Sequence, residues 1–310
     1  FDSLRNKIMT LPDDVVVYPG HGAGSACGKK MAKETESTIG LQKQFNYALR
    51  ADMSKAEFVR EVTEGLVDPP QYFPKNAVMN RMGYESIDNV MQQGSTPLNV
   101  REFVTVAEST GALILDTRKK EDFIKGFIPG AIFIGLDGQF ASWVGTLVTD
   151  LQQPLLLVCD EGTEEEAVTR LARVGYDNCQ GFLKGGMAAW KADNREVDTL
   201  ETITVDEFLG RHGKSSEITL DVRRKSEYDA EHLVGARNFP LDFINRNMAE
   251  INRNQTYLIH CAGGYRSAIA ASILKSRGFD NVVDVDGGFS AIKASGKAQL
   301  TQFVEQITEL

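Results

Sequence analysis

The segment CAGGYRS (261–267) joins a thiol, paired glycines and an arginine, between the apolar run TYLIH and the helical pattern SAIAASILKSRG. At such a junction, unpaired backbone N–H groups and the positive end of the helix stabilise a thiolate and bind an anion. Gly263 and Gly264 allow the backbone to turn its amides toward the sulfur. Arg266 adds a permanent charge on a planar fork that suits an oxyanion. The pattern predicts that Cys261 is a nucleophile for a small anionic substrate.

A buried structural cysteine is the alternative interpretation of Cys261, because free cysteine is among the residue types most often buried. For a cysteine considered alone, that interpretation is favoured by about four to one. Here the strand, the cysteine, the glycine pair, the arginine and the helix occur together, and this combination reverses the odds.

The elements that would position this loop occur twice in the chain. Residues 116–136 (DTRKKEDFIKGFIPGAIFIGL) align without a gap on residues 221–241, and PLLLVCDEG and FLKGGMAAW match TYLIHCAGG and DVDGGFSAI. In each copy, short Val/Ile/Leu runs alternate with amphipathic helical stretches, which is typical of α/β domains with a mostly parallel sheet covered on both faces. Ligands of such sheets bind outside the carboxyl ends of the strands, where we expect Cys261.

With the upstream DVR and VGARNFP and the downstream DVDGGFSAI, the CAGGYRS segment resembles the rhodanese sulfurtransferases. The resemblance implies three-layer α/β domains with central parallel sheets. It also implies that Cys261 takes a sulfane sulfur from thiosulfate or a low-molecular-weight persulfide and passes it to a thiol or cyanide. Backbone amides would hold the persulfide charge, from residues Ala262, Gly263, Gly264, Tyr265, Arg266 and Ser267. Related phosphatases carry five residues between cysteine and arginine, whereas four stand here, which disfavours phosphatase activity.

The first copy lacks the glycine pair and the arginine of this loop, because its corresponding segment reads CDEGTEEEAV. Cys159 aligns with Cys261, but Glu164 stands where Arg266 does, and two further glutamates follow. Acidic residues suit a helix start, yet they would repel an anionic substrate. We therefore predict an inactive structural or docking domain over residues 96–200 and an active domain over residues 201–310.

Other polar residues of the two copies are given structural roles. Arg118 and Arg223, in the repeated D-x-R pattern, are expected to pair with neighbouring acids and brace the sheets. His232 is expected to pack, and the side chain of His260 should point to the strand face opposite its neighbours. Cys179 is expected to be a buried strand residue.

Residues 1–95 are of a different kind: a strand, a glycine-rich loop with His21 and Cys27, and a helical stretch around Phe45. They resemble the last strand and C-terminal helices of the metallo-β-lactamase αββα fold, in the branch fused to two rhodanese domains. We expect a C-terminal remnant of that domain, without its N-terminal part and with apolar surface left exposed. In full-length relatives the resemblance implies a persulfide dioxygenase with mononuclear iron.

The ligands of that iron are not expected in this chain, because the family's H-x-H-x-D-H motif is absent from it. The four histidines are dispersed, and His21 alone cannot hold a metal ion. We predict no metal and no cofactor here, with iron implied only if the missing domain is present. Cys27 precedes two lysines, and its loop lacks the spacing of a phosphate-binding loop.

Composition sets the remaining limits. The net charge of −9 disfavours nucleic acid or an anionic membrane as the main partner. No apolar run is long enough for a membrane span, and four cysteines without C-x-x-C spacing fit a reducing cytoplasm. Small sulfur donors and thiol acceptors are the expected partners, and self-association into a homo-oligomer is left open. The competing hypothesis is a noncatalytic module that docks or regulates a persulfide dioxygenase.

Overall fold

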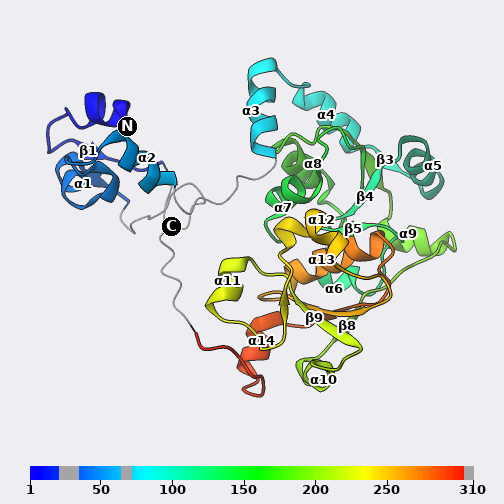
Figure 1. Ribbon diagram of the computed structural model, residues 1–310. Helices are drawn as coiled ribbons and strands as arrows, with labels where there is room; N and C mark the ends of the chain where they lie inside the picture. Colours follow the sequence, from blue (N-terminus) through cyan, green and yellow to red (C-terminus); the bar gives the residue numbers. More distant parts are fainter. Residues whose placement is uncertain (21–34, 64–71, 304–310) are drawn as a thin grey trace. The chain divides into compact units, whose positions relative to one another are not determined.

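The computed structural model of the 310-residue chain describes residues 1–20, 35–63 and 72–303. It divides into two compact units, one within Phe1–Pro69 and one within Pro70–Glu305, and each is described by itself. His21 and Cys27 lie outside the described residues. Figure 1 shows the elements of each unit.

The larger unit contains two five-stranded sheets in which all neighbouring strands are parallel. The first sheet has the order β3 (Pro97–Leu98), β7 (Cys179–Leu183), β6 (Leu155–Val158), β4 (Leu113–Asp116) and β5 (Ile132–Phe133). The second has the order β8 (Glu201–Ile203), β12 (Val282–Val285), β11 (Thr256–His260), β9 (Glu217–Asp221) and β10 (Arg237–Asn238). Corresponding strands occupy corresponding places, so the predicted duplication of an α/β domain is confirmed.

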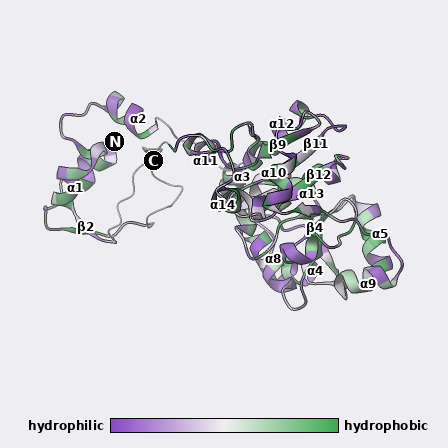
Figure 2. Cartoon of the chain, turned by 90° about the horizontal axis from the view of Figure 1, so that it is seen from below, coloured by the Kyte–Doolittle hydropathy of each residue, from purple (hydrophilic) through white to green (hydrophobic). Residues whose placement is uncertain are grey.

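Helices separate the strands along the chain. Those of the first copy are α5 (Val100–Thr110), α6 (Lys120–Phe123), α7 (Phe140–Leu147), α8 (Glu164–Ala172) and α9 (Gly186–Ala192). Those of the second are α10 (Val205–Arg211), α11 (Lys225–Ala230), η3 (Leu241–Phe243), α12 (Ile244–Asn247), η4 (Met248–Glu250), α13 (Tyr265–Ser276) and α14 (Gly288–Ala294). Figure 2 shows that α5 and α9 carry both hydrophobic and hydrophilic residues.

The central strands are buried along their whole length. Every residue of β6 and of β12 is buried. Because successive side chains of a strand point to opposite faces, a fully buried strand requires cover on both faces of its sheet. The predicted three-layer arrangement follows from this burial.

Helix α13 differs from the amphipathic helix that we predicted. Its residues from Ser267 to Leu274 are all buried, so it has no solvent-facing side. The reason is tertiary: α13 packs on its own sheet and also against β5 of the first copy (Figure 1). The Phe133 N–H, on the edge strand β5, donates to Ser272 Oγ at 2.9 Å. One apolar core is therefore continuous from the first copy into the second.

Two helices before the first copy belong to the same compact unit. They are α3 (Tyr72–Met82) and α4 (Ile87–Gly94). On α4, Val90 and Gly94 are buried, and a Cβ at Gly94 would lie 2.7 Å from Val168 and 3.2 Å from Cys179. This unit begins at Pro70, whereas the boundary drawn from the sequence follows residue 95.

The smaller unit contains a two-stranded antiparallel sheet and short helices. The strands are β1 (Val16–Val17) and β2 (Ser37–Thr38), and the helices are η1 (Leu4–Ile8), α1 (Ile39–Phe45), η2 (Tyr47–Leu49) and α2 (Lys55–Thr63). Ile39, Leu49 and Met53 are buried, whereas Phe45 is 79% exposed and Tyr18 is 73% exposed. The predicted exposure of apolar surface in this region is confirmed for these side chains.

Among the described residues, the helices are all too short or too polar to span a lipid bilayer.

Candidate active site around Cys261

Cys261 lies directly after β11, and α13 begins at Tyr265. The Gly264 amide donates a hydrogen bond to Cys261 Sγ at 3.1 Å. Gly264 has a φ of 102°, in the left-handed region where a side chain would be strained. Ser267 Oγ donates to the Gly264 carbonyl at 3.1 Å. The sequence thus folds into the predicted strand, loop and helix, with a backbone donor aimed at the sulfur atom.

Backbone N–H groups at the start of α14 donate hydrogen bonds to the carbonyls of this loop. The Phe289 N–H donates to the Cys261 carbonyl at 2.6 Å, and the Ser290 N–H donates to the Ala262 carbonyl at 3.0 Å. A Cβ at Gly288 would lie 2.5 Å from the Cys261 carbonyl oxygen. Only glycine permits so close an approach of the two backbones. The glycine pair of DVDGGFSAI is therefore part of the cysteine site.

Arg266 is held by a carboxylate that the sequence analysis did not identify. Its Nη1 and Nη2 atoms donate to Glu227 Oε2 at 2.6 Å and to Oε1 at 2.8 Å. Burial alone would raise the pKa of Glu227, but the hydrogen bonds and charge of Arg266 outweigh it and lower that pKa. The signal lay in the repeat, since Asp122 occupies the position of Glu227 in the first copy. Arg266 is thus fixed near the loop by a two-pronged ion pair.

Arg266→Leu is expected to slow sulfur transfer from thiosulfate roughly 100-fold, because it removes the cation and leaves the Glu227 carboxylate unpaired near an anionic substrate. The measurement is the single-turnover rate of persulfide formation. Arg211→Leu is the matched control: Arg211 pairs with Glu217 at 2.6 Å in the same domain. Equal rate losses in both variants would contradict a role for Arg266 at the site.

Cys261 itself is only 1% exposed. The catalytic hypothesis requires an accessible sulfur atom, and this burial is the one feature of the site that does not favour it. His260, which precedes it, is fully buried, and its ring lies 6.2 Å from those of Phe208 and Phe289. Its ring packs against these two aromatic side chains, and its Nδ1 atom lies 3.4 Å from the Cys261 carbonyl oxygen.

The other predicted structural residues occupy the expected surroundings. Arg118 pairs with Asp116, and Arg223 pairs with Asp221, each at 2.6 Å. The predicted pairing is confirmed, with the acid of the same D-x-R triplet as the partner. His232 stacks on Tyr228 with ring centroids 3.6 Å apart. Cys179 is a fully buried strand residue, as predicted.

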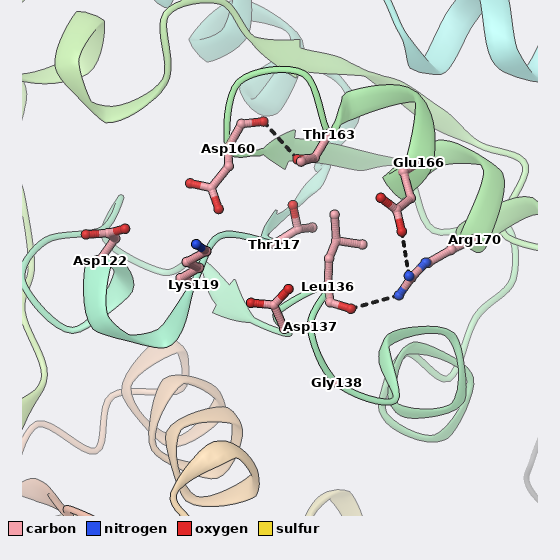
Figure 3. A pocket seen from close by; sticks show the side chains of 10 residues that line it. All are labelled: Thr117, Lys119, Asp122, Leu136, Asp137, Gly138, Asp160, Thr163, Glu166 and Arg170. Atoms are coloured by element: carbon pink, nitrogen blue, oxygen red, sulfur yellow. Dashed lines mark hydrogen bonds and ion pairs between the residues drawn. The ribbon is translucent and has the colours of Figure 1, made fainter.

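The corresponding place in the first copy is an acidic cavity. A cavity of about 570 Å³ is lined by four acidic and two basic side chains, in the set Thr117, Lys119, Asp122, Leu136, Asp137, Gly138, Asp160, Thr163, Glu166 and Arg170. Arg170 points to Glu166, at 2.5 Å, and donates to the Leu136 carbonyl (Figure 3). The lining has two more acidic than basic side chains, so the cavity offers an anion little attraction.

Cys159 is a poor nucleophile in this setting. The pKa of its thiol is raised to about 12, chiefly by burial; a hydrogen bond with Thr117 lowers this pKa, and the Glu164 carboxylate adds to the rise. A thiol with so high a pKa stays protonated at neutral pH. This chemistry agrees with the expectation that the first copy does not transfer sulfur.

We expect Cys159 to resist alkylation. The raised pKa of Cys159 lies well above pH 8. At that pH its thiolate fraction should therefore be on the order of 100- to 1000-fold below that of an ordinary thiol. Iodoacetamide labelling followed by peptide mass spectrometry measures this rate, with the urea-unfolded chain as the reference. Equal labelling of Cys159 in the folded and unfolded chains would contradict the prediction.

The described residues do not form a metal site. Across residues 1–20, 35–63 and 72–303, no group of three or more His, Cys, Asp or Glu side chains is arranged to hold a metal ion. These residues therefore do not fit the mononuclear iron that the resemblance implies for a persulfide dioxygenase domain, and no reaction step is assigned to iron.

Comparison with known proteins identifies the family. The model for the rhodanese-like domain matches residues 100–193 and again residues 204–295. The second match contains the complete loop from Cys261 to Ser267 and the glycine pair that supports it.

Relatives and solved structures resemble parts of the chain. The uncharacterized protein YqhL of Bacillus subtilis (strain 168) is 32% identical over 90 residues, which are 29% of this chain and 70% of YqhL. The putative sulfur carrier protein YrkF of the same organism is 38% identical over 106 residues, 34% of this chain and about half (55%) of YrkF. A metallo-β-lactamase structure from Staphylococcus aureus subsp. aureus COL is 30% identical, with a TM-score of 0.45, over 57% of this chain and 47% of that protein.

Proposed function

Because the chain belongs to the rhodanese-like family, we propose that it is a sulfurtransferase whose reacting residue is Cys261. The observation that carries the proposal is the 3.1 Å hydrogen bond from the Gly264 amide to Cys261 Sγ at the start of a buried helix. Such a position stabilises a thiolate and, after reaction, a persulfide anion. The similarity to a putative sulfur carrier protein supports the same class of chemistry.

The proposed donor is thiosulfate or a low-molecular-weight persulfide. The Cys261 thiolate attacks the outer sulfur atom, a new S–S bond forms, and the old S–S bond breaks. Sulfite, or the thiolate of the persulfide donor, leaves with the bonding electrons. The amides of residues 262–267 are proposed to hold the charge of the Cys261 persulfide, and Arg266 to orient the donor.

A thiol or cyanide is the proposed acceptor. The acceptor attacks the outer sulfur of the persulfide, and the Cys261 thiolate departs unchanged for the next cycle. The acceptor leaves as a new persulfide or as thiocyanate. No net oxidation occurs, so the reaction needs no cofactor within this chain.

The second candidate function is a noncatalytic one, and the first copy favours it there. Its acidic cavity and the raised pKa of Cys159 suit a structural or docking domain. We further propose that residues 1–95 derive from a metallo-β-lactamase-type persulfide dioxygenase domain, which rests on the sequence resemblance alone. In such a parent protein, one domain consumes or supplies the persulfide that the other handles. The free thiols of Cys159, Cys179 and Cys261 suit a cytoplasmic location.

The test is a single turnover followed by intact-mass measurement. The chain is incubated with thiosulfate, desalted and weighed, and then exposed to glutathione. A mass gain of one sulfur atom that glutathione removes is the expected result. If neither thiosulfate nor glutathione persulfide produces an adduct, the sulfurtransferase proposal fails and the docking function takes its place.

A further inference from the structure

A lysine of the first copy reaches the cysteine loop of the second. Lys120 Nζ, on α6, lies 2.7 Å from Asp284 Oδ2 on β12 and 4.0 Å from Asp286 Oδ1. The Asp284 side chain is fully buried, and that of Lys120 is 15% exposed. A buried carboxylate needs a charged or hydrogen-bonding partner, and here this partner comes from the other domain.

The same ammonium group lies against Gly264, whose amide donates the hydrogen bond to Cys261 Sγ. A Cβ built on Gly264 would lie 2.7 Å from Lys120 Nζ. Lys120 therefore occupies the space over Gly264 that a side chain would fill. Since the Gly264 amide donates to Cys261 Sγ, a shift of this glycine changes the hydrogen bond to the sulfur.

A second contact fixes the next residue of the loop on the first copy. Tyr265 Oη donates to the Gly135 carbonyl at 2.7 Å. A Cβ at Gly138 would lie 2.2 Å from the Tyr265 ring, so the ring fills the space beside this glycine. Two consecutive residues at the start of α13, Gly264 and Tyr265, thus contact the first copy.

The arrangement has no equivalent in the other direction. The position of Asp284 is occupied by Phe182 in the first copy, and Lys225, the counterpart of Lys120, pairs with Asp229 on its own helix. The lysine contact between the copies is therefore made only at the copy that has the intact cysteine loop. A general feature of domain packing would not require this.

From these contacts we infer that Lys120 of the first rhodanese-like domain is a positioning residue for Gly264 and Cys261 of the second. The inference rests on the proposed function for its catalytic meaning. It gives the first domain a task in the reaction of the second, although its own cavity is unsuited to sulfur transfer.

Several charged or titratable groups lie around the loop. They are Arg266 on α13, Glu227 on α11, Asp242 in η3, His260 on β11, Asp284 on β12, Asp286 after it and Lys120 from α6. Arg266 is paired with Glu227, and Asp284 is paired with Lys120. Removal of Lys120 takes away the cation that lies against Gly264 and leaves the acidic groups in place.

The test measures the pH dependence of Cys261 alkylation by iodoacetamide in the full chain, by peptide mass spectrometry, for the wild type, Lys120→Met and Lys119→Met. In Lys120→Met the pH midpoint of alkylation should rise, and the rate at pH 7 should fall about tenfold. Lys119 is the neighbouring, exposed lysine, and its variant should match the wild type. The single-turnover rate with thiosulfate should fall in parallel in Lys120→Met alone.

A merely structural Lys120 would lower the melting temperature and leave the pH midpoint unchanged, and that result overturns the inference. If Lys120→Met does not fold, Lys120→Gln keeps the length and polarity of the side chain, and the same criterion applies. Alkylation requires no sulfur transfer. A wild type that forms no persulfide would therefore refute the proposed function while the alkylation comparison still decides the role of Lys120.

Discussion

Cys261→Ser is expected to abolish the gain of one sulfur atom from thiosulfate. The serine keeps the loop, because it still offers an acceptor to the Gly264 amide, but its hydroxyl is not ionised at neutral pH and cannot form a persulfide. Intact-mass measurement after a single turnover checks this. The expected loss is complete within detection.

Cys159→Ser is the control for that experiment, since Cys159 holds the corresponding place in the first copy. Because burial raises the pKa of Cys159 to about 12, its removal should leave the mass gain unchanged. A gain that persists in Cys261→Ser would show that another thiol accepts sulfur, and would end the assignment of the second copy as the active one.

Gly288→Ala is expected to reduce the rate of sulfur transfer by about 100-fold. A Cβ at this position would lie 2.5 Å from the Cys261 carbonyl oxygen, so the cysteine backbone must move to admit it. Displacement of a reacting group by about 1 Å can cost a hundredfold in rate. The single-turnover rate, with circular dichroism to verify folding, measures the effect.

Gly186→Ala separates that displacement from simple backbone strain. Gly186 is the counterpart of Gly288 in the first copy, and its φ of 53° is close to the 57° of Gly288. A Cβ there would lie 3.8 Å from the Cys159 carbonyl, which is an ordinary contact. Both variants should lose stability by about 1 kcal/mol or more from the left-handed backbone, but only Gly288→Ala should lose the rate. Equal rate losses would show that strain alone is responsible.

The conformation of the loop was predictable because its determinants are local. The alternation of apolar runs and helical patterns predicts the strand before Cys261 and the helix after it. Glycine at position 264 then allows the left-handed turn that aims an amide at the sulfur. The comparison of the two copies likewise identified the acidic segment after Cys159, which the structure places beside a cavity with more acidic than basic side chains.

The partners of Arg266 and Gly264 could not be predicted in the same way. Glu227 and Lys120 lie far from the loop in the sequence, and nothing in their local patterns distinguishes them from solvated charges on short helices. Lys120 lines the site only because one domain packs on the other. A contact between two domains depends on the shapes of both surfaces, which no periodicity reports.

The sequence by itself determined the duplicated α/β architecture, the strand, loop and helix around Cys261 and the acidic segment at the corresponding place in the first copy, because strand, turn and helix propensities act over a few neighbouring residues. Tertiary structure alone decided that α13 is buried on every side, that Gly288 touches the cysteine backbone and that Lys120 covers Gly264. These features arise when segments distant in the chain pack at van der Waals distance, so they exist only in the folded protein.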